Sequence, residues 1–342
     1  MAEKRGICQV VECPDAQSPS SRSSPCPGVV DWSEVMVTDC REPSTAVQGS
    51  RHDQGESVST DRSREHRPPD FDSTLSTNLG MGGASFDEAT GVADATIRCT
   101  PEQTETDGSI PFGYLAAIAD NNNAMANILT AGWSDNSILI EVSYQTSRAA
   151  RGTVEVRSRN SSFNDLMGVA QGVMLDDEGA FGQSQCTSVT VPARPMVDDR
   201  GELPEVEHLA FPWESDVPPA PVDLFLKGGL EMVEGGAIYT SQLDSGWSSN
   251  YGSLHGGAIG LLITRAMRYA AIAASPENVE QVPISFNINY VRPAMVVPEP
   301  MQARARVIAV TTRFCTLEGE LILPSGKPAA RCRVIHRLVP RG

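Results

Sequence analysis

The second half of this chain repeats the first. The segment GSIPFGYLAAIAD at 108–120 aligns with GSLHGGAIGLLIT at 252–264, an offset of 144 residues, and SILIEVSY at 137–144 aligns with PISFNINY at 283–290 at an offset of 146. Two segments of similar composition could align by accident, but these matches keep their order and a nearly constant spacing. We therefore infer an internal duplication, which limits the fold to one that a single unit and its copy can build together.

Each copy has the same pattern of elements. A strand, a turn with two glycines and a second strand come first, followed by one long apolar helix and then by three strands rich in β-branched residues. The helix of the second copy, AIGLLITRAMRYAAIAA at 258–274, is apolar almost all round, so it should be enclosed rather than laid on a surface. This pattern predicts an α+β fold in which an antiparallel sheet wraps one long helix in each half.

The composition along the chain predicts where these units begin and end. Residues 1–72 are rich in Ser, Pro and Arg without a sustained apolar period, so we expect a disordered tail there. A degenerate first domain, whose match to the repeated pattern is weak, is expected over 73–192, and a second domain is expected over 222–342. The segment 193–221 between them is rich in Pro and acidic residues and is typical of a linker.

Charge and cysteine content exclude several classes of function. The net charge of −16 over 342 residues argues against a nucleic-acid surface, which needs a basic face. No apolar run is long enough to predict a membrane span, and the N-terminus has no apolar core of a secretory signal. None of the eight cysteines forms a CxxC pair, so free thiols in a reducing cytoplasm are expected. No cluster has the spacing of metal ligands, so neither a metal nor a cofactor is expected.

Three stretches of the second copy resemble a known family. They are NYGSLHGG at 250–257 with the helix after it, NYVRP at 289–293, and ELILPSGKPAA at 320–330. Together they resemble the PaaI-like branch of the acyl-CoA thioesterases, which have the hotdog fold. The resemblance implies that two hotdog units lie side by side, that their sheets join, and that active sites form between the two helices. A duplicated chain then supplies both partners itself, as a tandem or double hotdog.

The resemblance also implies the parts of the site. A glycine N–H at the helix start donates to the oxyanion, and an acidic residue later in a helix acts as the base. From Gly257 to Thr264 is seven residues, roughly 10 Å along a helix, which is too far for both to touch one carbonyl. The base must therefore come from the other helix, running in the opposite direction.

The two copies keep complementary parts of this site. In the second copy, Thr264 occupies the position where the family has Asp or Glu, whereas the aligned residue of the first copy is Asp120. In the first copy, Pro111 and Phe112 replace the residues aligned with His255 and Gly256, and a proline has no N–H to donate. We therefore predict one composite site, with an inactive counterpart where Pro111 faces Thr264.

The predicted site residues fall into two groups. The predicted catalytic residues are Asp120, Gly256, Gly257, Asn250 and His255. The predicted substrate-binding and coenzyme A-binding residues are Asn121, Arg265, Arg292, Arg313 and Tyr114. Two alternatives stay open: Asp120 begins an Asp-Asn-Asn-Asn run that could instead end the first helix, and His255 could be structural.

These residues predict an acyl-CoA thioesterase that releases a free acid and coenzyme A. Asp120 either activates water or attacks the thioester directly, and the sequence does not separate the two. One alternative is a non-catalytic protein that binds acyl-CoA as a sensor or carrier. A hydratase or dehydratase ranks last, because it needs a histidine beside an acid and His255 has no acid near it in sequence. The expected partner is the acyl-CoA alone, without nucleic acid or membrane, and we expect a homo-oligomer.

Overall fold

Thirteen strands form one continuous sheet that carries both copies of the repeat. The computed structural model describes residues 74–87, 89–130, 135–164, 166–192, 209–249 and 252–341. The predicted tail, 1–72, and the first part of the predicted linker, 193–208, lie outside the described residues. The strand order is β1-β2-β4-β5-β6-β3-β10-β13-β12-β11-β9-β8-β7. Outward from the β3–β10 junction, the two halves present their equivalent strands in the same order, as a duplication requires.

Apart from β7, which has no counterpart in the first half, the helices and strands of the two halves correspond. The first half contains α2 (Thr74–Asn78), β1 (Met81–Asp87), β2 (Val92–Arg98), α3 (Phe112–Thr130), β3 (Asp135–Thr146), β4 (Thr153–Phe163), β5 (Met167–Asp176) and β6 (Gly179–Pro192). The second half contains β7 (Trp213–Glu214), α4 (Pro221–Phe225), β8 (Gly229–Val233), β9 (Gly236–Ser241), α5 (Gly256–Ala274), β10 (Val279–Tyr290), β11 (Met301–Val310), β12 (Phe314–Ile322) and β13 (Pro328–Pro340). Short 3-10 turns precede α3 (Pro101–Gln103) and α5 (Ser245–Trp247).

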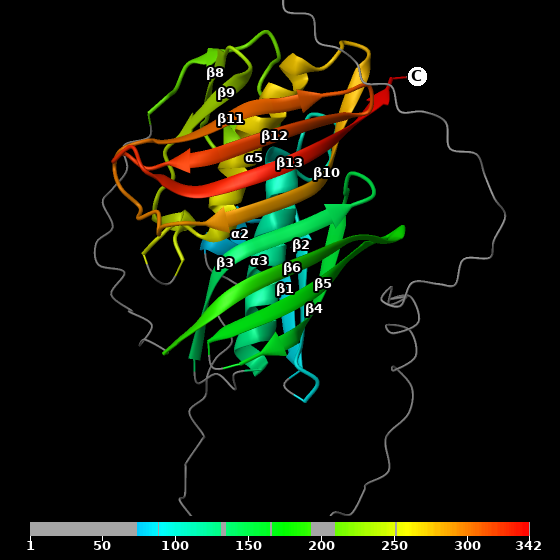
Figure 1. The fold of residues 1–342 in the computed structure, drawn as a ribbon, viewed down its shortest axis with the longest axis vertical. Coiled ribbons are helices and arrows are strands. Elements are labelled where there is room, and N and C mark those ends of the chain that lie inside the picture. Colours follow the sequence, from blue (N-terminus) through cyan, green and yellow to red (C-terminus); the bar gives the residue numbers. More distant parts are fainter. Residues whose placement is uncertain are drawn as a thin grey trace, which may run out of the picture. The chain divides into compact units, whose positions relative to one another are not determined.

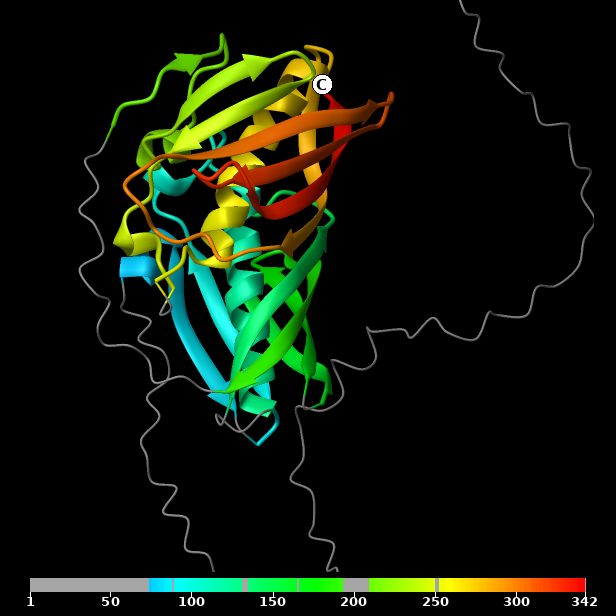
Figure 2. The same cartoon turned by 60° about the vertical axis from the view of Figure 1, so that its left-hand side comes forward.

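The halves join through an antiparallel pairing of β3 and β10. The register runs from Ser285 opposite Gln145 to Asn289 opposite Glu141. On one face of the joined sheet lie the two long helices, as Figures 1 and 2 show from different sides. This arrangement is the predicted α+β tandem hotdog, in which each half wraps its sheet around one helix.

The second helix forms the centre of its half. By length and composition α5 could cross a membrane, and it is the one helix of the described residues that could, but 78% of that stretch is buried inside the fold. Ile263 and Met267 on α5 pack against Gly319 of β12, where any side chain would collide with them. The almost uniformly apolar sequence of α5 therefore reflects its burial against the concave face of the sheet, as its pattern predicts.

The first helix differs from α5 because it carries buried amides. Asn122 donates hydrogen bonds of 2.8 Å to the backbone carbonyls of Ala93 and Val156, and Asn127 donates one of 2.8 Å to the Ser188 hydroxyl. These bonds attach α3 to the strands of its own sheet. The Asp-Asn-Asn-Asn run therefore lies inside the helix, and the alternative that it ends the helix is wrong. The amide nitrogens of Asn122 and Asn123 donate to strand carbonyls and hydroxyls, which offsets part of the cost of burying them.

The described part of the predicted linker adds an edge to the sheet. β7 pairs in parallel with β8, through Trp213 opposite Leu230 and Glu214 opposite Glu231. The Trp213 ring packs edge-on against the ring of Tyr269, with 5.0 Å between the centroids. Part of the segment that the sequence predicts as a linker is therefore packed against the second half.

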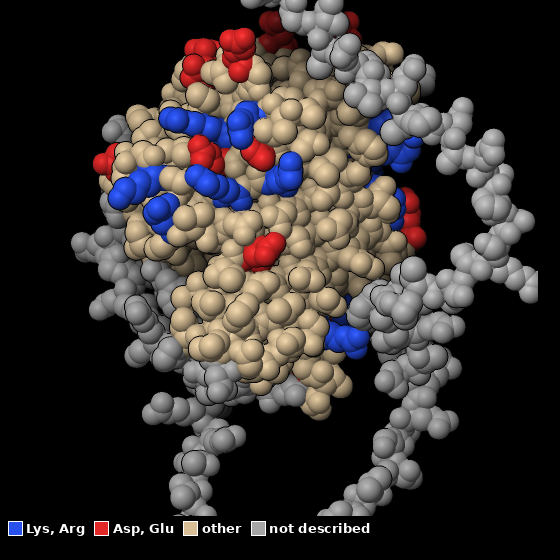
Figure 3. Space-filling view, viewed as in Figure 1, with Lys and Arg blue, Asp and Glu red and all other residues tan. Residues whose placement is uncertain are grey.

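Oppositely charged side chains alternate on the outer face of the second half. Arg306 forms an ion pair with Glu318 at 2.7 Å, and Arg331 lies 3.9 Å from Glu320, which is opposite Arg304 in the strand register. Figure 3 shows basic side chains gathered over the region of β11 to β13, with acidic side chains between them. All these arginines are exposed, so this face is a solvated surface where each ion pair adds little stability.

The two helices cross antiparallel at points where glycines allow close approach. A Cβ on Gly257 would collide with Ala117 of α3, and a Cβ on Gly113 would collide with the Leu261 backbone of α5. Ala117 and Leu261 are themselves 144 residues apart, so the two contacts are equivalent by the repeat. The crossing thus places the start of each helix beside the middle of the other.

This crossing predicts a clear difference between two glycine variants. Gly113→Ala should lower the free energy of unfolding by about 1–3 kcal/mol, since its Cβ meets backbone that cannot move aside. Gly260→Ala is the matched control, because its Cβ would meet Ala116 and Phe286 at an ordinary 3.4 Å. Urea unfolding of both variants measures the difference, and equal stabilities would contradict the close crossing.

Candidate active site

The Asp120 carboxylate lies between the two halves of the chain. Asp120 belongs to α3 and is only 3% exposed, yet its Oδ2 touches the position that a Cβ would take on Gly256, at the start of α5. Burial raises the pKa of the Asp120 carboxyl to about 7, and a hydrogen bond from the Gly257 N–H lowers it in part. The carboxyl therefore changes charge near neutral pH, which suits a general base.

The first residues of α5 and its N-cap determine which backbone N–H groups at the helix start are bonded. His255 is the N-cap of α5, and its Nδ1 accepts the Gly257 N–H at 3.0 Å. The first turn of a helix has N–H groups without partners in the helix, and the helix dipole favours negative charge there. Because Gly256 has no side chain, the Asp120 carboxylate can lie directly against this turn.

His255 is closer to an acid than its sequence neighbours suggest. Its Nδ1 lies 3.4 Å from Asp120 Oδ2, because the acid comes from the other half of the chain. Burial lowers the pKa of His255 to about 4, so the ring is neutral at physiological pH. The neutral imidazole accepts the Gly257 N–H and so orders the start of the helix. It also lies beside the Asp120 carboxylate.

Tyr290 completes the group and was not among the predicted site residues. Its hydroxyl oxygen lies 2.6 Å from the position of a Cβ on Gly256, on the same side as Asp120. This buried hydroxyl has no hydrogen-bond partner among the residues that the structure describes. Tyr290 lies in the NYVRP stretch that resembles the thioesterase family. A buried hydroxyl without a hydrogen-bond partner leaves no sign in the sequence, so Tyr290 could be identified only from the fold.

The equivalent place on the other side of the helix pair has different chemistry. There a Cβ on Gly113 would stand 2.6 Å from the Thr264 hydroxyl, and Thr264 donates to the Leu261 carbonyl at 2.9 Å. Tyr144, which aligns with Tyr290, donates its hydroxyl to the Phe112 carbonyl. This side therefore has no carboxylate between the helices, and both of its hydroxyls are used by the backbone.

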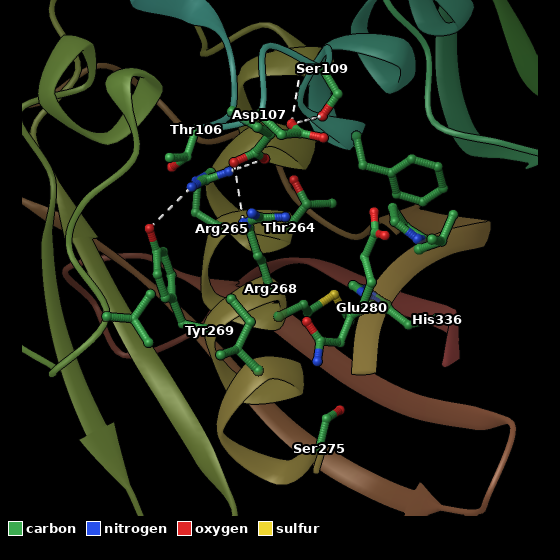
Figure 4. A pocket seen from close by; sticks show the side chains of 18 of the residues that line it. Thr106, Asp107, Ser109, Thr264, Arg265, Arg268, Tyr269, Ser275, Glu280 and His336 are labelled. Atoms are coloured by element: carbon green, nitrogen blue, oxygen red, sulfur yellow. Dashed lines mark hydrogen bonds and ion pairs between the residues drawn. The ribbon is translucent and has the colours of Figure 1, made fainter. Parts of the chain in front are cut away.

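A pocket of about 1600 Å³ opens on that second side, beside Thr264 rather than Asp120. Figure 4 shows Thr264, Arg268 and Glu280 around it, with His336 in its wall. Its lining includes Phe112 at the start of α3 but neither Asp120 nor Gly256. The pocket therefore includes neither the Asp120 carboxylate nor the start of α5.

The structure gives Arg265 a different task from the predicted one. It is 1% exposed, and its guanidinium makes two hydrogen bonds of 2.7 Å to the Asp223 carboxylate and an ion pair with Glu105. Tyr269 also donates to Asp223, at 2.5 Å. Because two buried carboxylates neutralise the guanidinium, it has no free face for a coenzyme A phosphate, and the prediction for Arg265 is corrected accordingly.

Tyr114 is likewise part of the core. Its side chain has no exposed surface, and its hydroxyl donates to the Asn78 carbonyl at 3.1 Å. Tyr114 is therefore a core residue and does not contact substrate, contrary to the prediction.

The remaining predicted residues keep the status of predictions. Asn121 is half-buried next to Asp120, Arg292 is exposed and donates to the Pro328 carbonyl at 2.8 Å, and Arg313 is exposed in the turn before β12. Asn250 lies outside the described residues. Within the described parts of the chain, no group of three or more His, Cys, Asp or Glu side chains is arranged to hold a metal ion. Cys99, Cys186, Cys315 and Cys332 are free thiols.

Comparison with known proteins identifies the family to which the second half is similar. Residues 243–337 match the family model described as the acyl-CoA thioesterase N-terminal domain. No curated protein matches the chain. The match confirms the resemblance to acyl-CoA thioesterases and the enzyme class that it implies, a thioester hydrolase. The PaaI-like branch stays a prediction.

Solved structures are similar to both halves together. A putative oleoyl thioesterase from Lactobacillus plantarum aligns with a TM-score of 0.51 at 11% identity, over 77% of this chain and 100% of its own. The tesB protein of Mycobacterium avium subspecies paratuberculosis gives 0.53 at 10%, over 79% and 100%. A protein of unknown function with a hot dog fold from Alicyclobacillus acidocaldarius gives 0.55 at 12%, over 75% and 96%. These likenesses confirm the tandem hotdog fold.

Proposed function

We propose that this protein hydrolyses an acyl-CoA thioester to a free acid and coenzyme A at one composite site between its halves. The observation that carries this proposal is the position of the Asp120 carboxylate from α3 against the first turn of α5. The match of residues 243–337 to an acyl-CoA thioesterase domain supports the substrate class. One half thus supplies the base, and the other supplies the donors for the thioester oxygen.

The proposed reaction uses the groups already in contact. The thioester oxygen accepts a hydrogen bond from the Gly256 backbone N–H, where developing negative charge is also favoured by the helix dipole. The Gly257 N–H is held by His255 Nδ1 and keeps the imidazole beside the carboxylate. Ionised Asp120 takes a proton from water as the water oxygen bonds to the carbonyl carbon. When the tetrahedral intermediate collapses, the carbon–sulfur bond breaks, and the proton held by Asp120 passes to the leaving thiolate of coenzyme A.

The direct test is release of free coenzyme A. The full chain should be incubated with short, medium, long-chain and aromatic acyl-CoAs, and the new thiol measured with a chromogenic reagent. Turnover of at least one class supports the proposal, and the preferred class identifies the acyl group. Binding of acyl-CoAs without any release would contradict it and would favour the non-catalytic sensor or carrier.

One contact also favours the hydratase alternative enough to test it. The sequence ranks a hydratase last because no acid neighbours His255, but the structure places Asp120 Oδ2 3.4 Å from His255 Nδ1. An enoyl-CoA substrate separates the two reactions, because hydration gives a hydroxyacyl-CoA with the thioester intact whereas hydrolysis gives free coenzyme A. Mass analysis of the products distinguishes them directly.

The pH dependence of hydrolysis should follow the charge of Asp120. Since its pKa is raised to about 7 and only the ionised form accepts a proton, kcat/KM should rise tenfold per pH unit below about 7 and level off above it. His255, with a pKa lowered to about 4, should add no second change in this range. A rate profile that is flat between about pH 5.5 and 8 would exclude Asp120 as the base.

A further inference from the structure

We infer that the Tyr290 hydroxyl is a further catalytic group, which holds the attacking water together with the Asp120 carboxylate. This inference rests on the proposed hydrolysis and adds a residue that touches the reacting water. Three observations carry it, namely the position of the hydroxyl, its lack of a partner, and the contrast with its repeat-related counterpart Tyr144.

The position of the hydroxyl comes from the end of β10. Tyr290 is the last residue of that strand, and its oxygen lies 2.6 Å from the point where a Cβ of Gly256 would stand. Asp120 Oδ2 lies even closer to the same point. Because Gly256 has no side chain, both oxygens pack directly against its backbone at the first turn of α5.

The hydroxyl is buried and unpaired although hydrogen-bonding groups surround it. Among the described residues, no side chain or backbone atom forms a hydrogen bond with it, and Asp120, its nearest charged neighbour, forms none either. A buried hydroxyl left without a partner costs free energy, so its retention needs a reason. Two polar oxygens that lie beside the same glycine without a direct bond are suited to be bridged by a water.

The counterpart in the other half shows that this state is not imposed by the fold. Tyr144 aligns with Tyr290 at the repeat offset of 146, and its hydroxyl donates to the Phe112 carbonyl. That side has Thr264 in place of the carboxylate. The tyrosine is therefore satisfied by the backbone where no carboxylate stands, and is left free where the carboxylate stands.

The phenol keeps its proton throughout the reaction. Burial raises the pKa of Tyr290 well above its usual value, and the nearby Asp120 carboxylate raises it further. Tyr290 therefore orients the water only by hydrogen bonds, while Asp120 accepts the proton that the water loses. The proton later returns from Asp120 to the thiolate, so Tyr290 neither gains nor loses one.

The test compares Tyr290→Phe with Tyr144→Phe in the full chain. Tyr290→Phe should lower kcat for coenzyme A release by about 10- to 100-fold, the range for a hydrogen bond that involves a charged group. KM should stay within about threefold, and Tm should be unchanged or raised, because no existing bond is lost. Tyr144→Phe removes a bond to the backbone, so it should lower Tm and leave kcat within about threefold.

The outcomes separate this inference from the proposed function. An active wild type whose kcat is unaffected by Tyr290→Phe would overturn the role of Tyr290 and leave Asp120 in place. A fall in Tm and kcat together in Tyr290→Phe would assign the residue a structural role and also overturn the inference. A wild type that releases no coenzyme A from any substrate would refute the proposed function, and the inference with it.

Discussion

Replacement of Asp120 by asparagine should lower kcat for coenzyme A release by about a thousandfold, the middle of the range for loss of a general base. The amide has almost the same shape as the acid and cannot accept the proton. KM and acyl-CoA binding should change little, because Asp120 acts on water rather than on the bound ligand. The measurement is thiol release by the variant and the wild type at a pH of about 8, beside a binding assay.

The same variant should be more stable than the wild type at alkaline pH, which provides an internal control for folding. Asp120 has a usual pKa of 3.8 and a native pKa of about 7, so between these values the folded protein holds a proton that the unfolded chain has released. Wild-type stability from this group therefore falls as pH rises through this range, by up to about 4 kcal/mol above pH 7. Asparagine carries no such cost.

Two results would contradict this account of Asp120. Turnover that survives Asp120→Asn would remove the carboxylate from the mechanism and with it the argument that the two halves complement each other. If the difference in stability between the variant and the wild type were the same at a pH of about 4 and about 8, the Asp120 carboxyl would not be buried as the structure has it. Lost activity with raised alkaline stability supports both parts together.

Replacement of Arg265 by methionine should lower the free energy of unfolding by about 3–5 kcal/mol, as expected when one partner of a buried ion pair is removed. Methionine fills much of the volume but leaves the Asp223 carboxylate buried without its cation, while Glu105 keeps only its ion pair with Arg268 at 3.1 Å. The control is Arg306→Met, whose ion pair with Glu318 is exposed and should be worth about 1 kcal/mol or less. Urea unfolding of both variants measures the difference.

The pH dependence gives the Arg265 prediction a second readout. Burial raises the pKa of Asp223, but Arg265 lowers it to a value below the usual one, so this pair stabilises the fold above the usual pKa and loses its effect as pH falls. The deficit of Arg265→Met should therefore shrink in acid, where the unpaired Asp223 carboxylate takes up a proton. A variant of normal stability but with a much higher KM for acyl-CoA would instead restore the predicted role in phosphate binding.

The fold was predictable because duplication leaves a regular trace in a sequence. The offsets of 144 and 146 residues fix which strands and helices correspond, and the position of Asp120 follows from Thr264 by the same offset. The antiparallel crossing then followed from the length of a helix turn. Complementary losses in two aligned segments were therefore enough to predict that Asp120 meets Gly256 and Gly257.

Other parts of the site depend on partners that are distant in sequence. Arg265 was a reasonable candidate for a phosphate until the structure brought Glu105, 160 residues away, and Asp223 against it. Similarly, His255 gains an acid only when α3 lies beside α5, and Tyr290 is notable only because its hydroxyl lacks a partner. Burial and pairing of this kind leave no periodicity or spacing that the sequence could reveal.

The covalent link between the halves has a consequence for how such a site can change. In a dimer of identical subunits, every substitution alters both equivalent sites, so a residue harmful at one cannot be kept for the sake of the other. Here Asp120 and Thr264 occupy equivalent positions but vary independently, as do Gly256 and Phe112. In the proposed composite site, hydrolysis therefore places no requirement on the side around Thr264, and that side can change without cost to the other.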